Sequence, residues 1–88
     1  MSYQFNTTDI LITQLGDEGV AFNSTTNEYF SLNETSFKIL KGIENNVSIE
    51  DIRKQLENEY DISADECEKA VNSTIQSFLA KKLVVEAW

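Results

Sequence analysis

The chain has 88 residues, of which 41% are hydrophobic and 25% are charged, values typical of one small soluble domain. Its net charge of −8 argues against a nucleic-acid partner, because such binding takes most of its affinity from cationic contacts. A single cysteine excludes an internal disulfide and favours a cytoplasmic location. We expect one domain over residues 1–88.

Residues 1–9 are polar, and we predict that they form a loose lead-in to the domain. They contain no basic region followed by an apolar run, so no signal peptide is expected. No apolar stretch approaches the roughly 20 residues that a membrane span needs, so we expect no membrane partner.

Three short strands are predicted at residues 10–15, 20–23 and 28–32, which are rich in β-branched and apolar side chains. Residues 16–19 and 24–27 are predicted turns, and such short connections indicate an antiparallel meander. Because side chains alternate across a sheet, we place one set on the inner face: Ile10, Ile12, Val20, Phe22, Phe30 and Leu32. Tyr29 and Ser31 then point the other way.

Three helices follow, each with a capping residue at its predicted start. The caps are Asn33, Ser48 and Ser63, and Glu66 completes a capping box with Ser63. The third helix should run to about Lys82 and lie along the sheet, and residues 83–85 form a further short strand or an extended tail. The predicted fold class is α+β, with the order β-β-β-α-α-α.

The residues offer no catalytic set. The chain lacks histidine, so neither a zinc site of the usual spacing nor a Ser-His or Cys-His pair can be assembled. The carboxylates cluster at turns and helix starts, where the helix dipole alone favours them. Cys67 lies on the apolar stripe of the third helix and is predicted to be a core residue. We therefore expect no enzyme activity, no metal and no cofactor.

Two helices joined by a short turn beside a sheet resemble a winged helix-turn-helix, whose last helix would read DNA. The exposed positions at the start of that helix carry Asp65, Glu66 and Glu68, which would repel phosphates. This charge argues against DNA as the ligand of the scaffold. A DNA-binding regulator is kept only as an alternative, together with a small regulatory subunit that binds another protein through its helices.

Three segments together resemble the PqqD-like family, the peptide recognition elements of ribosomal peptide natural-product pathways. They are Tyr29-Phe30-Ser31-Leu32-Asn33-Glu34-Thr35 after a hairpin, Ser48-Ile49-Glu50-Asp51-Ile52, and Phe78-Leu79-Ala80-Lys81-Lys82-Leu83-Val84. The likeness covers about residues 9–86. It implies a winged-helix fold that binds the leader segment of a precursor peptide as a fourth strand against residues 28–32. It also implies delivery of the leader to a modifying enzyme, with the leader peptidase of a lasso-peptide pathway favoured over the radical enzyme of a pyrroloquinoline quinone pathway.

An unpaired strand edge supports the same hypothesis, because its N–H and C=O groups can pair with any extended peptide. Small residues on the apolar stripe of the third helix would leave room for leader side chains. The predicted leader-binding residues are Glu28, Tyr29, Phe30, Ser31 and Leu32 on the strand and Glu66, Ala70, Val71, Thr74, Ile75 and Phe78 on the helix. Plain core packing is the alternative for the helix residues, and an ordinary surface aromatic is the alternative for Tyr29.

Overall fold

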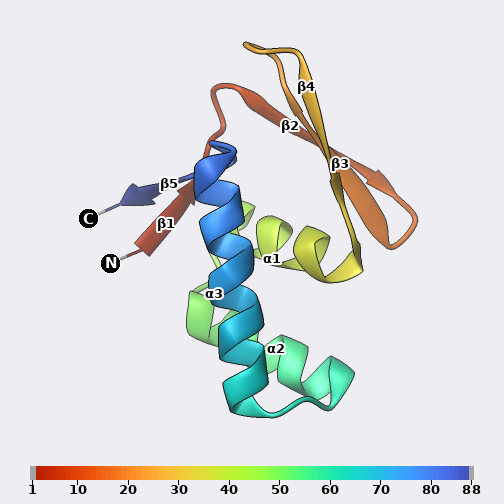
Figure 1. Ribbon diagram of the computed structural model, residues 1–88, viewed down its shortest axis with the longest axis vertical. Coiled ribbons are helices and arrows are strands. Elements are labelled where there is room, and N and C mark those ends of the chain that lie inside the picture. The colour runs from red at the N-terminus through yellow and green to blue at the C-terminus, as the bar shows by residue number, and fades with distance from the viewer. Residues whose placement is uncertain (1, 88) are drawn as a thin grey trace.

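The computed structural model describes residues 2–87, with side chains from Tyr3 to Glu86. Met1, the first residue of the predicted lead-in, and Trp88 lie outside the described residues. Figure 1 shows a sheet at one side, three helices below and beside it, and both chain ends together at the far side. The elements are β1 (Ser2–Phe5), β2 (Ile10–Leu15), β3 (Glu18–Asn23), β4 (Glu28–Leu32), α1 (Glu34–Glu44), α2 (Ile49–Tyr60), α3 (Ala64–Ala80) and β5 (Val84–Ala87).

The predicted antiparallel meander is confirmed as the three-stranded sheet β2-β3-β4. Its first turn contains only Gly16 and Asp17, because Leu15 already pairs with Glu18. Gly16 has a φ of 65°, the left-handed conformation that glycine adopts at little cost. The second strand therefore begins at Glu18, two residues earlier than the sequence predicted.

The predicted inner face is wrong for β3. The register pairs Ala21 with Ile12 and Phe30, so Ala21 is the inner residue, and Val20 and Phe22 lie on the outer face. The physical reason is the close approach of α1, whose Phe37 ring occupies the space that a side chain at Gly19 would need. Only small side chains fit on that face of β3, so the larger ones turn outward.

One polar residue of β3, Asn23, also faces inward and is 5% exposed. Its side-chain oxygen accepts hydrogen bonds from the backbone N–H groups of Thr25 and Thr26, at 2.9 and 3.2 Å. The buried amide therefore organises the turn into β4 without leaving its oxygen unsatisfied.

All three predicted helix caps are confirmed. The side chains of Asn33, Ser48 and Ser63 each accept a hydrogen bond from a backbone N–H in the first turn of the following helix. Such a cap stabilises a helix by about 1 kcal/mol. Asn33 comes directly after the last residue of β4, so the cap fixes where the chain leaves the sheet.

The prediction that the third helix lies along the sheet is wrong, because α1 makes that contact. Helix α1 packs against β3 and β4, whereas α3 packs mainly on α2 and β5. The core joins all three helices to the inner sheet face, and its residues include Ile10, Ala21, Leu32, Phe37, Ile39, Leu40, Ile43, Ile52, Leu56, Cys67, Val71, Ile75, Phe78, Leu83 and Val84.

The predicted loose lead-in is also wrong where the structure describes it. Residues 2–5 form β1, which pairs antiparallel with β5 so that Tyr3 lies opposite Glu86 and Phe5 opposite Val84. Tyr3 and Phe5 pack against the core, and this apolar contact holds the segment in place. The predicted strand or tail at residues 83–85 is the start of β5.

Candidate functional site

The outer edge of β4 carries no partner strand among residues 2–87. Strand β4 lies at one border of the three-stranded sheet, and β1 and β5 pair only with each other in a separate two-stranded sheet. An edge of this kind presents a row of N–H and C=O groups to an incoming extended chain. The open edge predicted from the sequence is therefore present in this structure.

The register indicates which backbone groups point outward. The two-residue turn makes Leu15 and Glu18 a hydrogen-bonded pair, and hydrogen bonding alternates along an antiparallel ladder. By this alternation, the backbone N–H and C=O groups point toward β3 at Glu28, Phe30 and Leu32. Tyr29 and Ser31 then direct their N–H and C=O groups to the open side.

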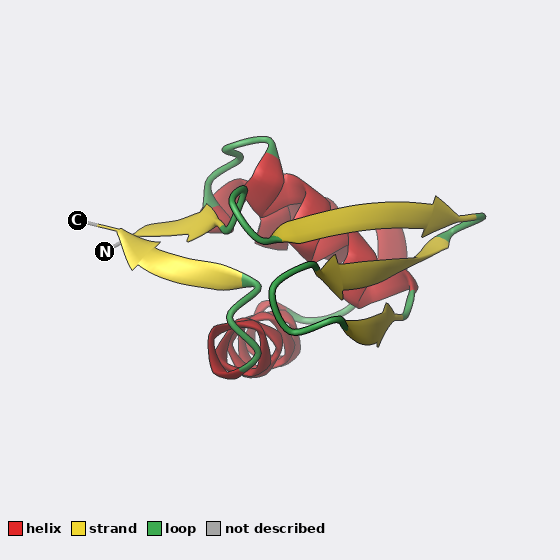
Figure 2. Cartoon of the chain, turned by 90° about the horizontal axis from the view of Figure 1, so that it is seen from above, coloured by secondary structure: helices red, strands yellow, loops and turns green. Residues whose placement is uncertain are grey.

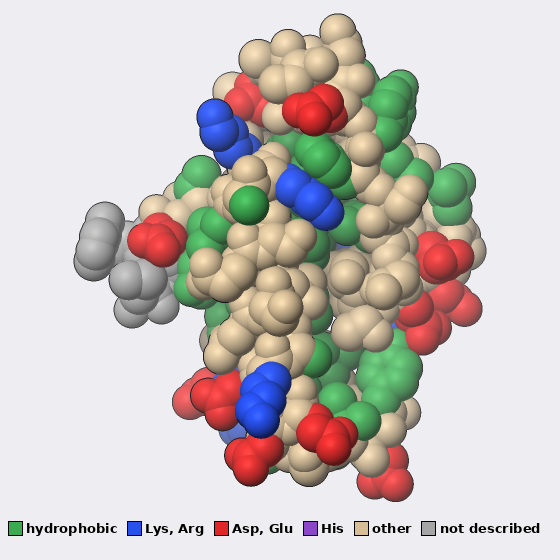
Figure 3. All heavy atoms as spheres, in the orientation of Figure 1, with side chains coloured by type: hydrophobic (Ala, Val, Ile, Leu, Met, Phe, Trp, Pro, Cys, Tyr) green, Lys and Arg blue, Asp and Glu red, His purple; other side chains and the backbone are tan. Residues whose placement is uncertain are grey.

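One side of α3 faces the same region. At 3.6 residues per turn, four residues line up along the helix next to its core stripe: Ala70, Thr74, Ser77 and Lys81. The first three are small, and the Thr74 hydroxyl donates to the carbonyl of Ala70 at 2.8 Å, so it needs no other partner. We call these four residues the α3 stripe. Figure 3 shows uncharged side chains along the front of α3, with charges gathered toward its two ends.

The α3 stripe meets β4 through one side-chain contact. The Lys81 Nζ atom lies over the Phe30 ring, 5.4 Å from its centre, at a distance where a cation is attracted to an aromatic face. Figure 2, the view from above, places α3 and β4 on the same side of the molecule. A strand added to β4 would therefore run beside the α3 stripe.

The structure brings together only part of the predicted site. Glu28, Tyr29 and Ser31 are exposed on β4, and Phe30 is half-buried on its inner side. On α3, Glu66 and Ala70 are exposed and Thr74 is half-buried. The remaining predicted residues are core residues with 1–4% of their surface exposed, which agrees with the core-packing alternative: Leu32, Val71, Ile75 and Phe78.

Sequence reasoning missed Ser77 and Lys81. The helical spacing that pointed to Ala70 and Thr74 also leads to both residues, at intervals of three and four.

The outer face of the sheet carries an apolar row that the sequence also failed to predict. Leu11, Phe22 and Tyr29 lie side by side across β2, β3 and β4. The rings of Phe22 and Tyr29 are 4.6 Å apart, while Leu11 and Tyr29 are 63% and 71% exposed. Phe22 is half-buried between these two exposed side chains, so the three form a continuous apolar row on the outer face.

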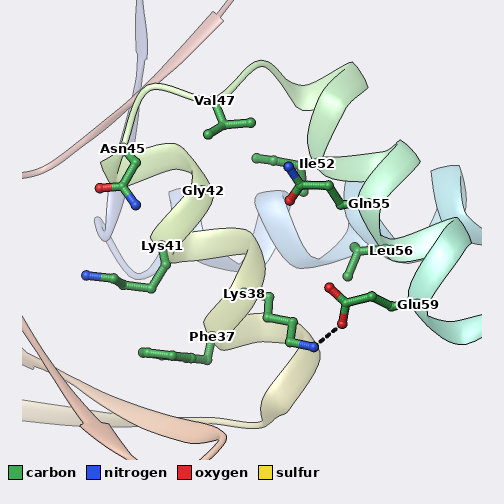
Figure 4. Close-up of a pocket in the computed structure, with 10 residues that line it drawn as sticks. All are labelled: Phe37, Lys38, Lys41, Gly42, Asn45, Val47, Ile52, Gln55, Leu56 and Glu59. Carbon is green, nitrogen blue, oxygen red and sulfur yellow. Dashed lines mark hydrogen bonds and ion pairs between the residues drawn. The ribbon is translucent and has the colours of Figure 1, made fainter.

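The hollow drawn in Figure 4 is separate from β4 and α3. It lies between α1 and α2, has a volume of about 260 Å³, and includes Phe37, Lys38, Ile52 and Glu59 in its lining. Lys38 and Glu59 form an ion pair across it, and its other charged residue, Lys41, pairs with Glu44 outside the lining.

A metal cluster and a reactive thiol are the two kinds of chemistry that the sequence raises. Among residues 2–87, no three His, Cys, Asp or Glu side chains gather as a metal site would need. Cys67 is 1% exposed, and burial raises the pKa of its thiol, which opposes formation of the reactive thiolate. The predicted core role of Cys67 is thus confirmed. No helix among these residues is long and apolar enough to cross a bilayer.

Comparison with protein families gives a match over residues 18–84 to PqqD, described as coenzyme PQQ synthesis protein D. The chain belongs to the PqqD family. The match spans β3, β4 and all three helices, so the open edge and the α3 stripe both lie within the family's shared region. No match was found among curated proteins.

Two solved structures have the same fold as this PqqD-family chain. One, titled "TbiB1 in Complex with the TbiA(beta) Leader Peptide", has a TM-score of 0.88 and 19% identity, and the alignment covers 97% of this chain and 98% of that chain. The other, "Lasso peptide synthetase B1 complexed with the leader peptide", has a TM-score of 0.87 and 19% identity, with coverage of 98% and 100%. The predicted α+β fold is confirmed by this likeness.

Proposed function

We propose that this chain binds the leader segment of a ribosomally made precursor peptide, which adds as a strand to the open edge of β4. The unpaired edge beside the α3 stripe is the observation that carries the proposal. Both structural neighbours are bound to leader peptides, and the second is a lasso peptide synthetase component by its title, which supports the same role here. We further propose a domain that spans the chain, acts in lasso-peptide biosynthesis in the cytoplasm, and has no catalytic activity.

Strand addition provides affinity and leaves selectivity to side chains. Each main-chain hydrogen bond contributes about 0.5–1.5 kcal/mol net. Each well-buried apolar leader side chain contributes about 1.5–3 kcal/mol. After the cost of ordering the peptide, a dissociation constant between about nanomolar and micromolar is expected.

The bound leader must then reach an enzyme. We assign the contact between this chain and that enzyme to the outer sheet face, with its row of Leu11, Phe22 and Tyr29. The outer-facing positions of that sheet include Glu18 but no Lys or Arg. The matching partner surface is apolar with a basic rim, since opposite charges guide association. A second copy of this chain would bring acid against acid. The occupant we propose is the partner enzyme of the pathway, with a leader peptidase favoured.

A titration tests leader binding. The probe is a fluorescein-labelled peptide with the leader sequence of a short precursor, to be sought among the genes that neighbour this chain's gene. We expect a saturable rise in fluorescence anisotropy and a one-to-one stoichiometry. Absence of saturable binding by the folded protein would refute the proposed function. A leader of unrelated sequence serves as the control for non-specific attraction.

A further inference from the structure

Lys81 is distinguished from the chain's other basic residues by its place next to the open edge. The ion pairs formed among the described residues use Lys38, Lys41 and Arg53. Lys81 instead holds its ammonium group over the Phe30 ring, with the group at the molecular surface. A positive charge therefore lies beside β4, and none of the ion pairs formed among the described residues involves it.

The position of this charge relative to an added strand follows from the pleat. Side chains alternate across a sheet, and Phe30 lies on the inner side of β4. The added residue directly opposite Phe30 has its Cβ about 4.5–5.5 Å away and points to the same inner side. That residue meets the Lys81 ammonium group.

We propose that Lys81 is a specificity-determining residue of the leader site. Its ammonium group binds the side-chain carboxylate of the leader residue opposite Phe30. This inference rests on the proposed function and adds to it the chemistry of one leader position. The leader should therefore carry Asp or Glu at one inner-facing position of the added strand.

The negative charge of the rest of the chain further restricts which leader sequences and registers can bind. A net charge of −8 disfavours an acidic peptide in general, and Glu28 lies two residues from Phe30 on the same side of β4. A leader shifted by two residues would bring its carboxylate either opposite Glu28, which repels it, or opposite Leu32, which cannot pair with it. A shift by one residue would turn the carboxylate to the outer face. Lys81 would then fix the register of the leader as well as its composition.

The experiment selects peptides without assuming a leader sequence. A phage library of random 12-residue peptides, displayed with no free carboxyl terminus, is selected on three forms of the full chain. These are the wild type, Lys81→Glu and Lys82→Glu. The second variant is the matched control, because it makes the same charge change at the neighbouring residue. Thermal unfolding establishes that all three forms are folded, and Lys81→Gln replaces Lys81→Glu if charge reversal disturbs the helix end.

We expect wild type and Lys82→Glu to enrich Asp or Glu at one position of the aligned peptides, and Lys81→Glu to enrich Lys or Arg there. An amidated synthetic copy of the best wild-type peptide should lose about three- to fivefold in affinity when that acid becomes Gln. The same change should not weaken its binding to Lys81→Gln.

Three other results would overturn the inference. Enriched peptides without a preferred acid, or an acid preference that persists in Lys81→Glu, would refute the role of Lys81 and leave the proposed function standing. Failure of the wild type to retain any peptide, together with failure to bind the leader probe, would refute strand addition itself and this inference with it.

Discussion

The ring of Phe37 lies against the backbone of Gly19, where any side chain on the glycine would overlap the Cδ1 and Cε1 atoms of the ring. Phe37 is in the first full turn of α1, and Gly19 is in the central strand of the sheet. This contact sets how closely the helix approaches the sheet. It also determines which face of β3 can carry large side chains.

Gly19→Ala should therefore destabilise the fold. The added methyl group forces Phe37 or the strand to move, which costs about 1–3 kcal/mol of the free energy of unfolding. Urea unfolding followed by circular dichroism measures the loss. In a Phe37→Leu background the same glycine change should cost clearly less, because the flat ring is gone. An equal cost in both backgrounds would contradict the assigned contact.

Tyr60→Phe should weaken the link between α1 and α2. The Tyr60 hydroxyl donates to Glu34 at 2.6 Å and accepts from Lys38 at 3.1 Å. Two hydrogen bonds raise the pKa of Lys38, and the bond to Glu59 has a larger effect than the bond to Tyr60. The Lys38 ammonium group therefore stays charged across the usual pH range. Loss of the bond to Glu34 should reduce the free energy of unfolding by about 0.5–1.5 kcal/mol, measured by urea titration.

Tyr29→Phe is the matched control for that change. Tyr29 is 71% exposed, so removing its hydroxyl should leave stability within about 0.5 kcal/mol of the wild type. Equal losses in the two variants would argue against the interhelix bond.

Ser31→Pro should abolish leader binding while the protein stays folded. Proline removes one of the N–H groups assigned to the open edge of β4, and prolines are tolerated at such edges. Affinity for the labelled leader should fall at least about tenfold, and Ser31→Ala should bind nearly as the wild type does. The measurement is fluorescence anisotropy, with circular dichroism as the test of folding.

Gln14→Pro tests whether the leader uses the other border of the sheet. The same alternation directs the N–H of Gln14 to the outer edge of β2, which is also unpaired among the described residues. This variant should keep leader affinity. Loss of binding in Gln14→Pro with normal binding in Ser31→Pro would move the site from β4 to β2.

Leu11→Glu should separate leader binding from delivery. Leu11 is 63% exposed on the outer face, so stability should change by no more than about 0.5 kcal/mol. Leader affinity should be unchanged, whereas leader removal by the purified partner enzyme should slow at least about tenfold. Gln76→Glu, which adds the same charge at an exposed position on α3, should leave both activities unchanged.

Cys67 should make stability fall at alkaline pH. Burial raises the pKa of its thiol in the folded state, so the unfolded chain loses this proton first. The free energy of unfolding is therefore unaffected below a pH of about 8.5, the unfolded value, and declines above it. Cys67→Ala should lack this decline in urea titrations from pH 7 to 10, although the cavity lowers its stability throughout. If the free energy of unfolding of Cys67→Ala fell with pH as steeply as that of the wild type, other groups would be the cause of the decline.

The features that the sequence predicted correctly are local ones. Asn33, Ser48 and Ser63 cap their helices because a cap depends on residues within one turn. Which side chains of β3 point to the inner face could not be predicted, because this depends on Phe37 of a different element. The alternation of Tyr3 and Phe5 is a strand signal, but it has meaning only with β5, about 80 residues later in the chain.

The candidate site divides in the same way. The open edge follows from strand order and turn length, both readable from neighbouring residues. The contact of Lys81 with Phe30 joins segments about 50 positions apart. Only the three-dimensional arrangement reveals that the small residues of the α3 stripe and this cation border one edge.

The pairing of β1 with β5 has a consequence for biosynthesis of the chain. Ser2 lies opposite Ala87, so β1 cannot pair until β5, about 80 residues later, has been made. The meander and α1 have no such dependence and can assemble while synthesis continues. The open edge of β4 would thus form early in synthesis, whereas the β1–β5 ribbon closes only once β5 has been made.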